Sequence, residues 1–186
     1  MLITKIFLSV MLLCLLQVVA LGNIMDRKVS QKGIDLIESH EGTMYKVYVC
    51  PGGIITGGVG HALSPEDRRT YTLGSPIEQD QIDWWLKEDL KKAEKIVNNW
   101  VTREINQNQF DALVSFVFNV GAEQFKRSTL LKLINKGDFS GASKELPKWR
   151  KAKGNVLKGL VSRRADEEKL FNEAEVAEVP VTTTVQ

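Results

Sequence analysis

The stretch that decides the fold is HEGTMYKVYVCPGGIITGGVGHAL, residues 40–63. Within it, Pro51-Gly52-Gly53 separates two apolar runs, and Gly57-Gly58 interrupts the second. The apolar residues on either side are mostly β-branched: Val47, Val49, Ile54, Ile55 and Val59. Such runs with proline and glycine between them predict a strand, a turn and a returning strand. The sequence therefore predicts a small β-hairpin over residues 45–60.

Outside the hairpin the apolar residues recur every three or four positions, which is typical of helices. A first helix is expected from about Ser30, a good N-cap, to His40. A long helix is expected to begin at the capping box Ser75-Pro76-Ile77-Glu78. Residues 64–74 are expected to form a loop, and further helices are expected over 109–120, 129–135, 140–146 and 159–172. The predicted fold class is α+β, mainly α, with a small N-terminal hairpin lobe, a helical C-terminal lobe and a cleft between them.

An apolar leader precedes this body. Residues 6–22 are nearly all apolar and follow Lys5. As a helix they would span about 25 Å, short of the roughly 30 Å hydrocarbon core of a bilayer. Ala20-Leu21-Gly22 offers small residues at the positions that a signal peptidase reads. Residues 1–22 are therefore predicted to be a signal peptide or a releasable signal anchor, and the choice between cleavage and retention stays open.

The rest of the chain divides simply. The 186 residues, 43% apolar and 26% charged, suit one compact domain with short extensions. Residues 23–29 are expected to be a linker, 30–172 the domain, and 173–186, rich in Val, Thr and Glu, a disordered tail. The expected localisation is export across a bacterial inner membrane to the periplasm, with the leader holding the chain to that membrane if it is not cleaved. A monomer is expected.

The charge is unevenly distributed. The net charge of +2 does not call for a nucleic-acid partner, and none is expected. The segment from Phe125 to Arg164, however, contains 12 Lys and Arg residues and only two acidic residues, Asp138 and Glu145. Such a segment raises the local concentration of an anionic polymer, and the bacterial wall is one. The alternative is a solvated helical surface with no special partner.

Glu41 is the first candidate catalytic residue. It closes the first predicted helix, where Gly42 can cap and redirect the chain. A carboxyl group at a helix C-terminus faces the negative end of the helix dipole, so its protonated form is favoured. A carboxyl that stays protonated near neutral pH is what a general acid needs to donate to a glycosidic oxygen.

Cys50 and Thr56 are expected beside it. Cys50 lies nine residues after Glu41, and Thr56 lies six residues further, on the returning strand. A hairpin of this length would bring both side chains near the end of the first helix. Cys14, in the leader, is the only other cysteine. Two cysteines and two histidines at unrelated spacings do not make a metal site, so neither a metal nor another cofactor is expected.

At this point the sequence resembles a known family. Glu41-x8-Cys50-x5-Thr56, followed by GGVGHAL, is similar to the catalytic Glu-x8-Asp/Cys-x5-Thr signature of the phage lysozymes, glycoside hydrolase family 24. ALVSFVFNVG (112–121) with Phe125 and STLL (128–131) resembles the second-lobe helices of lambdoid endolysins. Trp149 and KGLVSRR (158–164) resemble their C-terminal helix. The resemblance covers residues 30–172, and three blocks in order make it specific.

The resemblance implies a lysozyme-like two-lobe fold and an endolysin that acts on peptidoglycan glycan strands for host cell lysis. The bond cut would be the β-1,4 bond between N-acetylmuramic acid and N-acetylglucosamine. Glu41 matches the general acid, and Thr56 matches the hydroxyl that positions water or the sugar ring. Asn119 matches an amide that binds substrate in the cleft, and Trp149 an aromatic beside it. For the last two, a helix-end polar residue and a core indole are the alternatives.

Cys50 is the departure, since most relatives of this family carry Asp there. A carboxylate near a thiol raises the thiol pKa, so Cys50 would be mostly protonated unless Arg or Lys lies close. Cys50 would then orient the attacking water, or act as a thiolate nucleophile, or be a buried structural cysteine. Neither inverting nor retaining stereochemistry follows. If the leader stays attached, Cys14 could form a disulfide with Cys50 and keep the enzyme inactive.

Two other functions compete with a glycosidase. His61 as a base for Cys50 would give a Cys-His peptidoglycan amidase or peptidase, although a structural histidine is the simpler interpretation. Loss of the acidic residue at position 50 would alternatively leave a catalytically inactive protein that binds the wall.

Overall fold

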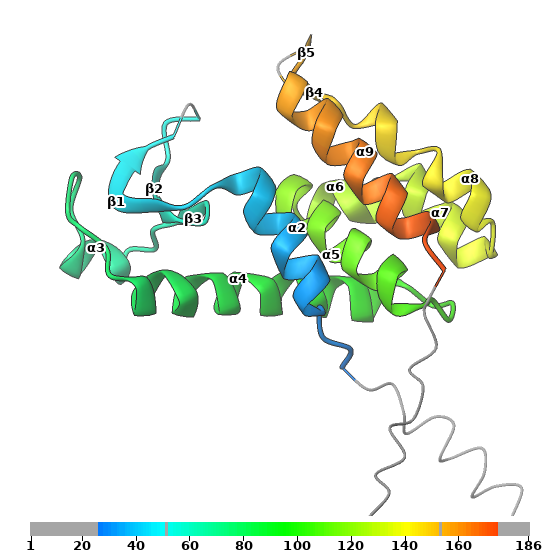
Figure 1. Ribbon diagram of the computed structural model, residues 1–186, viewed down its shortest axis with the longest axis horizontal. Helices are drawn as coiled ribbons and strands as arrows, with labels where there is room; N and C mark the ends of the chain where they lie inside the picture. The colour runs from blue at the N-terminus through cyan, green and yellow to red at the C-terminus, as the bar shows by residue number, and fades with distance from the viewer. Residues whose placement is uncertain (1–25, 51, 153, 175–186) are drawn as a thin grey trace, which may run out of the picture.

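The computed structural model describes residues 26–50, 52–152 and 154–174, which form a small sheet lobe and a larger helical lobe (Figure 1). The helices are α2 (Gln31–Glu41), α3 (Asp67–Thr70), α4 (Gln79–Trp100), α5 (Gln107–Val120), α6 (Ala122–Arg127), α7 (Thr129–Lys136), α8 (Phe139–Ser143), the 3-10 helix η1 (Leu146–Lys148) and α9 (Lys158–Asn172). The strands are β1 (Met44–Val49), β2 (Ile55–Gly58), β3 (His61–Ala62), β4 (Lys151–Ala152) and β5 (Asn155–Val156). The predicted α+β, mainly α, fold class is confirmed.

The sheet lobe contains the predicted hairpin. β1 and β2 are antiparallel, with Tyr48 opposite Thr56, and β3 adds a short third strand that the sequence did not predict. Helix α4 packs closely on β2, because a Cβ atom on Gly57 would lie 2.6 Å from Ile77 and 3.4 Å from Trp85 of α4. Gly57 is therefore required by close packing.

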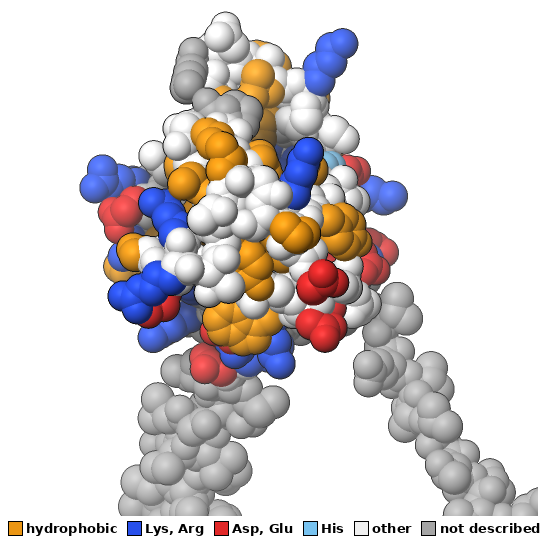
Figure 2. All heavy atoms as spheres, turned by 90° about the vertical axis from the view of Figure 1, so that its left-hand side faces the viewer, with side chains coloured by type: hydrophobic (Ala, Val, Ile, Leu, Met, Phe, Trp, Pro, Cys, Tyr) orange, Lys and Arg blue, Asp and Glu red, His pale blue; other side chains and the backbone are white. Residues whose placement is uncertain are grey.

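The sheet lobe is too small to bury all of its apolar side chains. Its core consists of residues from β1, the β2–β3 region and the start of α4: Val47, Val59, Leu63, Ile77, Ile82 and Trp85. Figure 2, which faces this lobe, shows hydrophobic side chains spread among polar ones over its surface. Tyr45, Leu73 and Trp84 are among the exposed ones. A small lobe has a high ratio of surface to volume, so such exposure is expected.

Helix α4 joins the two lobes. Figure 1 shows it running from beneath the sheet to the opposite side of the helical lobe. Its predicted start at Ser75-Pro76 is wrong, since the helix begins at Gln79. The preceding residues instead extend the edge of the sheet: Pro76 bridges to Lys46, and the Ile77 N–H donates to the Tyr45 carbonyl at 2.9 Å. Sheet hydrogen bonds thus override a local capping signal.

Helix α5 forms the centre of the helical lobe. Every residue from Phe110 to Val117 is buried, and α2, α4 and α9 all pack against it. The helix begins two residues before the predicted position because Asn106 and Gln109 form a reciprocal capping box. Gly121 ends it at a positive φ of 83°, as predicted.

Several smaller predictions need correction. The predicted loop 64–74 contains the helical turn α3. The helix predicted over 140–146 ends at Ser143, and Pro147 lies inside η1, because a proline is tolerated in the first turn of a helix. Helix α6 and the β4–β5 hairpin were not predicted, since six-residue helices and two-residue strands are too short to show a period.

The ends of the domain are only partly described. Residues 26–30 have no regular structure but contact the body: the Val29 N–H donates to Glu94 and the Ser30 N–H to Asp111, each at 2.9 Å. The leader 1–22 and residues 175–186 of the tail lie outside the described residues. Within the described part of the chain, none of the helices combines the length and the hydropathy that crossing a bilayer requires.

Gly33 of α2 provides a stability test. A Cβ atom there would lie 2.5 Å from Val29 and 2.8 Å from the buried Asp111, whose carboxylate is already held by Ser30. Gly33→Ala should lower the free energy of unfolding by about 1–3 kcal/mol, despite the better helix propensity of alanine. Denaturant titration followed by circular dichroism measures this.

Gly159 is the matched control, because it lies at the start of α9 with nothing within 4 Å of the added Cβ atom. Gly159→Ala should leave stability unchanged or raise it by up to about 1 kcal/mol. Equal effects of the two substitutions would contradict the packing of α2 on α5.

Candidate functional site

Glu41 is the last residue of α2, at the junction of the two lobes. Gly42 ends the helix at a φ of 69°, and its N–H donates to the Glu38 carbonyl at 3.0 Å. The Glu41 side chain is half-buried. A Cβ atom on Gly60 would lie 3.3 Å from Oε2 of Glu41, so the β2–β3 turn passes directly beside this carboxyl group. The turn between β2 and β3 therefore lies against the end of α2, while the expected approach of the Cys50 and Thr56 side chains to Glu41 stays a prediction.

Glu41 is bound by an arginine from the far end of the chain. Nη1 of Arg163, on α9, makes an ion pair with Oε1 of Glu41. Arg163 and its neighbour Arg164 are both buried. Arg163 is held in turn by α5, since its Nη2 donates to the Ser115 carbonyl at 3.1 Å. The ion pair joins α2 to α9 across the helical lobe.

Cys50 and Thr56 lie together at the tip of the hairpin. Cys50 follows β1, and its N–H donates to the Ile54 carbonyl at 2.9 Å, which closes the turn. Thr56, on β2, is buried and donates its hydroxyl proton to the same carbonyl at 3.0 Å. Cys50 is a free thiol within the described residues, whereas Cys14 lies outside them.

The environment of Cys50 favours its thiolate. The N–H groups of Ile54 and Gly52 lower the pKa of the thiol, and the Thr56 hydroxyl contributes in the same direction. The sequence interpretation expected a largely protonated thiol unless Arg or Lys lay close. The turn supplies backbone N–H donors in place of a cation, so a larger share of thiolate forms near neutral pH than in an ordinary cysteine.

Tyr48 is a site residue that the sequence did not single out. It lies two positions before Cys50 on β1 and directly opposite Thr56. Burial raises the pKa of Tyr48, and the negative charges of Cys50 and Glu41 add to this effect. Tyr48 is thus close enough to both groups to be influenced by each. The alternation of side chains along a strand places Tyr48 and Cys50 on one face, which was the available signal.

A cleft of about 510 Å³ opens at Glu41. It is bounded by the end of α2, the end of α5 and the start of α9, and its lining residues are Ser39, His40, Glu41, Asn119, Leu157, Gly159, Leu160, Ser162 and Arg163. Asn119 therefore shares the cleft with Glu41, and its Oδ1 accepts from Nη2 of Arg164 at 3.1 Å. Cys50 and Thr56 do not line this hollow; they belong to the sheet lobe next to it.

Trp149 packs against the central helix of the helical lobe. It is half-buried and makes an edge-to-face contact with Phe116 of α5, with 5.3 Å between ring centroids. It does not line the cleft around Glu41. Its described contact is that of a core indole, and a substrate-binding role for Trp149 stays a prediction.

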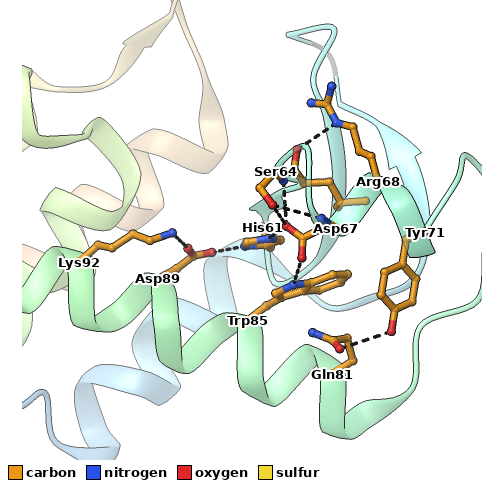
Figure 3. A network of polar contacts seen from close by, with 10 residues as sticks. His61, Ser64, Asp67, Arg68, Tyr71, Gln81, Trp85, Asp89 and Lys92 are labelled. Carbon is orange, nitrogen blue, oxygen red and sulfur yellow. Dashed lines mark hydrogen bonds and ion pairs between the residues drawn. The ribbon is translucent and has the colours of Figure 1, made fainter.

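His61 belongs to a separate network in the sheet lobe (Figure 3). Its Nδ1 lies 2.7 Å from Asp89 and its Nε2 3.3 Å from Asp67, and its ring stacks on Trp85 with centroids 4.7 Å apart. Trp85 also donates to Asp67 at 3.0 Å. Because both ring nitrogens bind carboxylates, neither is available as a base for Cys50. This arrangement contradicts the Cys-His alternative and confirms a structural histidine.

No group of three His, Cys, Asp or Glu residues in the described ranges is arranged to hold a metal ion.

Comparison with known proteins agrees with this geometry. The phage lysozyme family model matches residues 38–167. The chain belongs to the phage lysozyme family. It is 41% identical over 150 residues to the endolysin of Acyrthosiphon pisum secondary endosymbiont phage 1, which covers 78% of this chain and 99% of the relative. Its function is accordingly that of an endolysin, a hydrolase of bacterial peptidoglycan.

Two further relatives add detail. The chain is 37% identical over 124 residues to the SAR-endolysin of Bacteriophage PS119, covering 67% of this chain and 71% of that protein. Its fold is similar to the solved muramidase domain of SpmX from Asticaccaulis excentricus, with a TM-score of 0.71 and 35% identity. That alignment covers 80% of this chain and 99% of the solved one. The two-lobe lysozyme fold implied by the sequence is confirmed.

The His61 network makes stability depend on pH. Burial by itself lowers the pKa of His61, but Asp89 and then Asp67 outweigh it and raise the pKa above its ordinary value. The protonated ring thus stabilises the fold fully below the unfolded pKa of about 6.5, and this stabilisation is lost as pH rises through the folded pKa. Unfolding free energies measured from pH 5 to pH 9 should show this decline.

His61→Gln should remove most of that decline while lowering stability at pH 5. His40 is the control position, because burial lowers its pKa and its titration acts in the opposite direction. If the unfolding free energy of His61→Gln depends on pH as that of the wild type does, the ion pairs of His61 with Asp89 and Asp67 make no net contribution to stability.

Proposed function

We propose that the chain is a muramidase that hydrolyses the β-1,4 bond between N-acetylmuramic acid and N-acetylglucosamine, with Glu41 as its general acid. The observation that carries the proposal is the position of Glu41: a half-buried carboxyl group at a helix end, opening into a cleft and covered on one side by the hairpin. A general acid has to be placed so that its carboxyl group reaches the glycosidic oxygen of a bound substrate, and the cleft beside Glu41 provides that access.

The contacts of Glu41 assign different tasks to its two oxygens. Oε1 faces Arg163, whose guanidinium can only donate, so this oxygen cannot carry the acidic proton. Oε2 lies on the side of the Gly60 turn, toward the hairpin. The proton that passes to the glycosidic oxygen is therefore held by Oε2, while Arg163 fixes the orientation of the carboxyl group.

Cys50 and Thr56 act from the hairpin side. Two roles fit the lowered pKa of Cys50. As a thiolate it attacks the anomeric carbon while the glycosidic C–O bond breaks and Glu41 gives its proton to the leaving oxygen. Water, deprotonated by Glu41, then displaces the Cys50 sulfur from the sugar and restores the thiolate and the protonated Glu41. Alternatively it orients the attacking water together with the Thr56 hydroxyl. A covalent glycosyl-thioether detected by mass spectrometry after rapid quenching separates the first role from the second.

Substrate binding is assigned to the cleft. Asn119 lines it beside Glu41 and has an amide nitrogen free to donate to a sugar, since its Oδ1 is engaged with Arg164. Trp149 is assigned a weaker part, as a support for this wall through Phe116. The partner is the glycan strand of peptidoglycan, and the enzyme acts as a monomer.

Export is part of the proposed function. The apolar leader at 1–22 suits a signal peptide or a releasable signal anchor, and the similarity to a SAR-endolysin supports passage through a signal anchor. The chain would then act in the periplasm, held to the inner membrane for as long as the leader is retained. N-terminal sequencing of the exported protein distinguishes cleavage from retention.

Glu41→Gln tests the acid role. It should reduce the release of reducing ends from purified peptidoglycan by at least about a hundredfold, because removing a general acid costs about 10²–10⁴ in rate. Glu38→Gln, one turn earlier on the same helix and exposed, is the matched control and should keep full activity.

If Glu41→Gln still releases reducing ends at the wild-type rate, another residue is the acid. A wild-type protein that binds peptidoglycan but releases no reducing ends would favour the inactive wall-binding alternative. Release of peptide amines without reducing ends would mean that the bond cut is not glycosidic.

A further inference from the structure

Glu167 is the most deeply buried acidic residue near the cleft, and the chemistry described so far does not use it. It lies on α9, one turn after Arg163, with no exposed surface. Its Oε1 accepts from the Ser115 hydroxyl at 2.8 Å, from Nε of Arg163 at 3.1 Å and from Nη2 of Arg164 at 2.9 Å. Its Oε2 lies 2.9 Å from Nε of Arg164.

The guanidinium groups around Glu167 favour its carboxylate form. Burial raises the pKa of Glu167, while Arg164 and Arg163 oppose the effect. Three guanidinium nitrogens lie against the two carboxyl oxygens, and each of them can only donate. The Ser115 hydroxyl is the one neighbour among these that could also accept a proton.

Glu167 also determines where Arg163 points. The guanidinium of Arg163 is planar, with its donors in a fixed fork. Its Nε is held by Glu167 and its Nη2 by the Ser115 carbonyl. With those two nitrogens fixed, the plane of the group is fixed, and the remaining nitrogen, Nη1, is directed at Glu41.

The balance of charge around Glu41 also depends on Glu167. Two arginines, Arg163 and Arg164, face one carboxylate at the cleft and one in the core. Burial lowers the pKa of Arg164 to about 10, so it still carries its charge near neutral pH. Without the charge of Glu167, both cations would act on Glu41 uncompensated, and nearby cations generally favour the ionised form of a carboxyl group over the form that can donate a proton.

We propose that Glu167 is a positioning residue for the reaction: it aims Arg163 at Glu41 and neutralises one of the two arginine charges beside the cleft. The inference rests on the proposed acid role of Glu41. The other titratable groups that influence Glu41 are Tyr48 and Cys50 from the hairpin, together with His40, which is paired with Asp166 at 3.0 Å.

The direct test compares Glu167→Gln with Glu168→Gln in the full chain. Glu168 is the next residue on α9 and belongs to neither the cleft nor the buried cluster. Reducing-end release is measured from pH 4 to pH 9, with kcat and KM determined separately. Glu167→Gln should lower kcat at pH 7 about tenfold or more with KM nearly unchanged, and the alkaline limb of its profile should move about one pH unit lower.

Two further variants separate position from charge. Glu167→Asp keeps the negative charge but moves the carboxylate away from Arg163, because the side chain is one methylene shorter. The kcat should therefore fall, while the alkaline limb of the pH profile stays in place. Arg164→Met removes one cation and leaves Arg163 alone against the carboxylates of Glu41 and Glu167, so the limb should move to higher pH. Circular dichroism establishes that each variant is folded, and if Glu167→Gln does not fold, Arg164→Met and Glu167→Asp decide the question.

The outcomes are distinct. Profiles of Glu167→Gln and Arg164→Met that parallel the wild type at every pH would overturn the inference, because a merely structural residue changes the amount of active enzyme and not the shape of the profile. Absence of reducing-end release from both the wild type and Glu168→Gln would instead overturn the proposed function itself.

Discussion

The ion pair between Arg163 and Glu41 is the interaction on which the arrangement of the site depends. It links the last residue of α2 to α9, more than a hundred positions later in the chain, and both helices rest on the buried surface of α5. A carboxyl group at a helix end would otherwise be free to turn into solvent. Arg163 keeps it at the cleft, and Glu167 and Ser115 keep Arg163 in place. Glu41 is thus positioned by the core of the helical lobe, whereas the turn at Gly60, between β2 and β3, passes beside its other oxygen.

Much of the fold followed from pattern alone. The hairpin, the long helix and the buried helix before Gly121 were predicted, because β-branched runs and three-to-four-residue periodicity report burial directly. The errors occurred where tertiary contacts outweigh a local signal. Ser75-Pro76 has the composition of a helix start, but its backbone pairs with Lys46 and Val47 of β1. The short elements α3, α6, β4 and β5 carry too few residues for a period to be recognised.

Part of the geometry around Glu41 was predictable from the sequence, whereas the electrostatics were not. The spacing of Glu41, Cys50 and Thr56 predicted a hairpin folded onto a helix end, and Asn119 does share the cleft with Glu41. The lowered pKa of the Cys50 thiol could not be predicted, because the sequence does not show which backbone N–H groups of the turn point at the sulfur. The burial of both Arg163 and Arg164 could not be predicted either. Of two adjacent charged residues, one usually lies in the core and the other in solvent. Here the buried carboxylate of Glu167 pairs with both arginines and allows both to be buried.

A structure of Glu41→Gln bound to a peptidoglycan fragment tests the central claim most directly. The account predicts that a sugar spans the junction of the two lobes, with the glycosidic oxygen within hydrogen-bonding distance of the residue 41 side chain on its Oε2 side. Cys50 and Thr56 should then lie on the opposite face of the same sugar ring. A fragment bound away from residue 41, or one in which residue 41 and Cys50 contact different sugars, would contradict the assignment of the acid and of the hairpin residues.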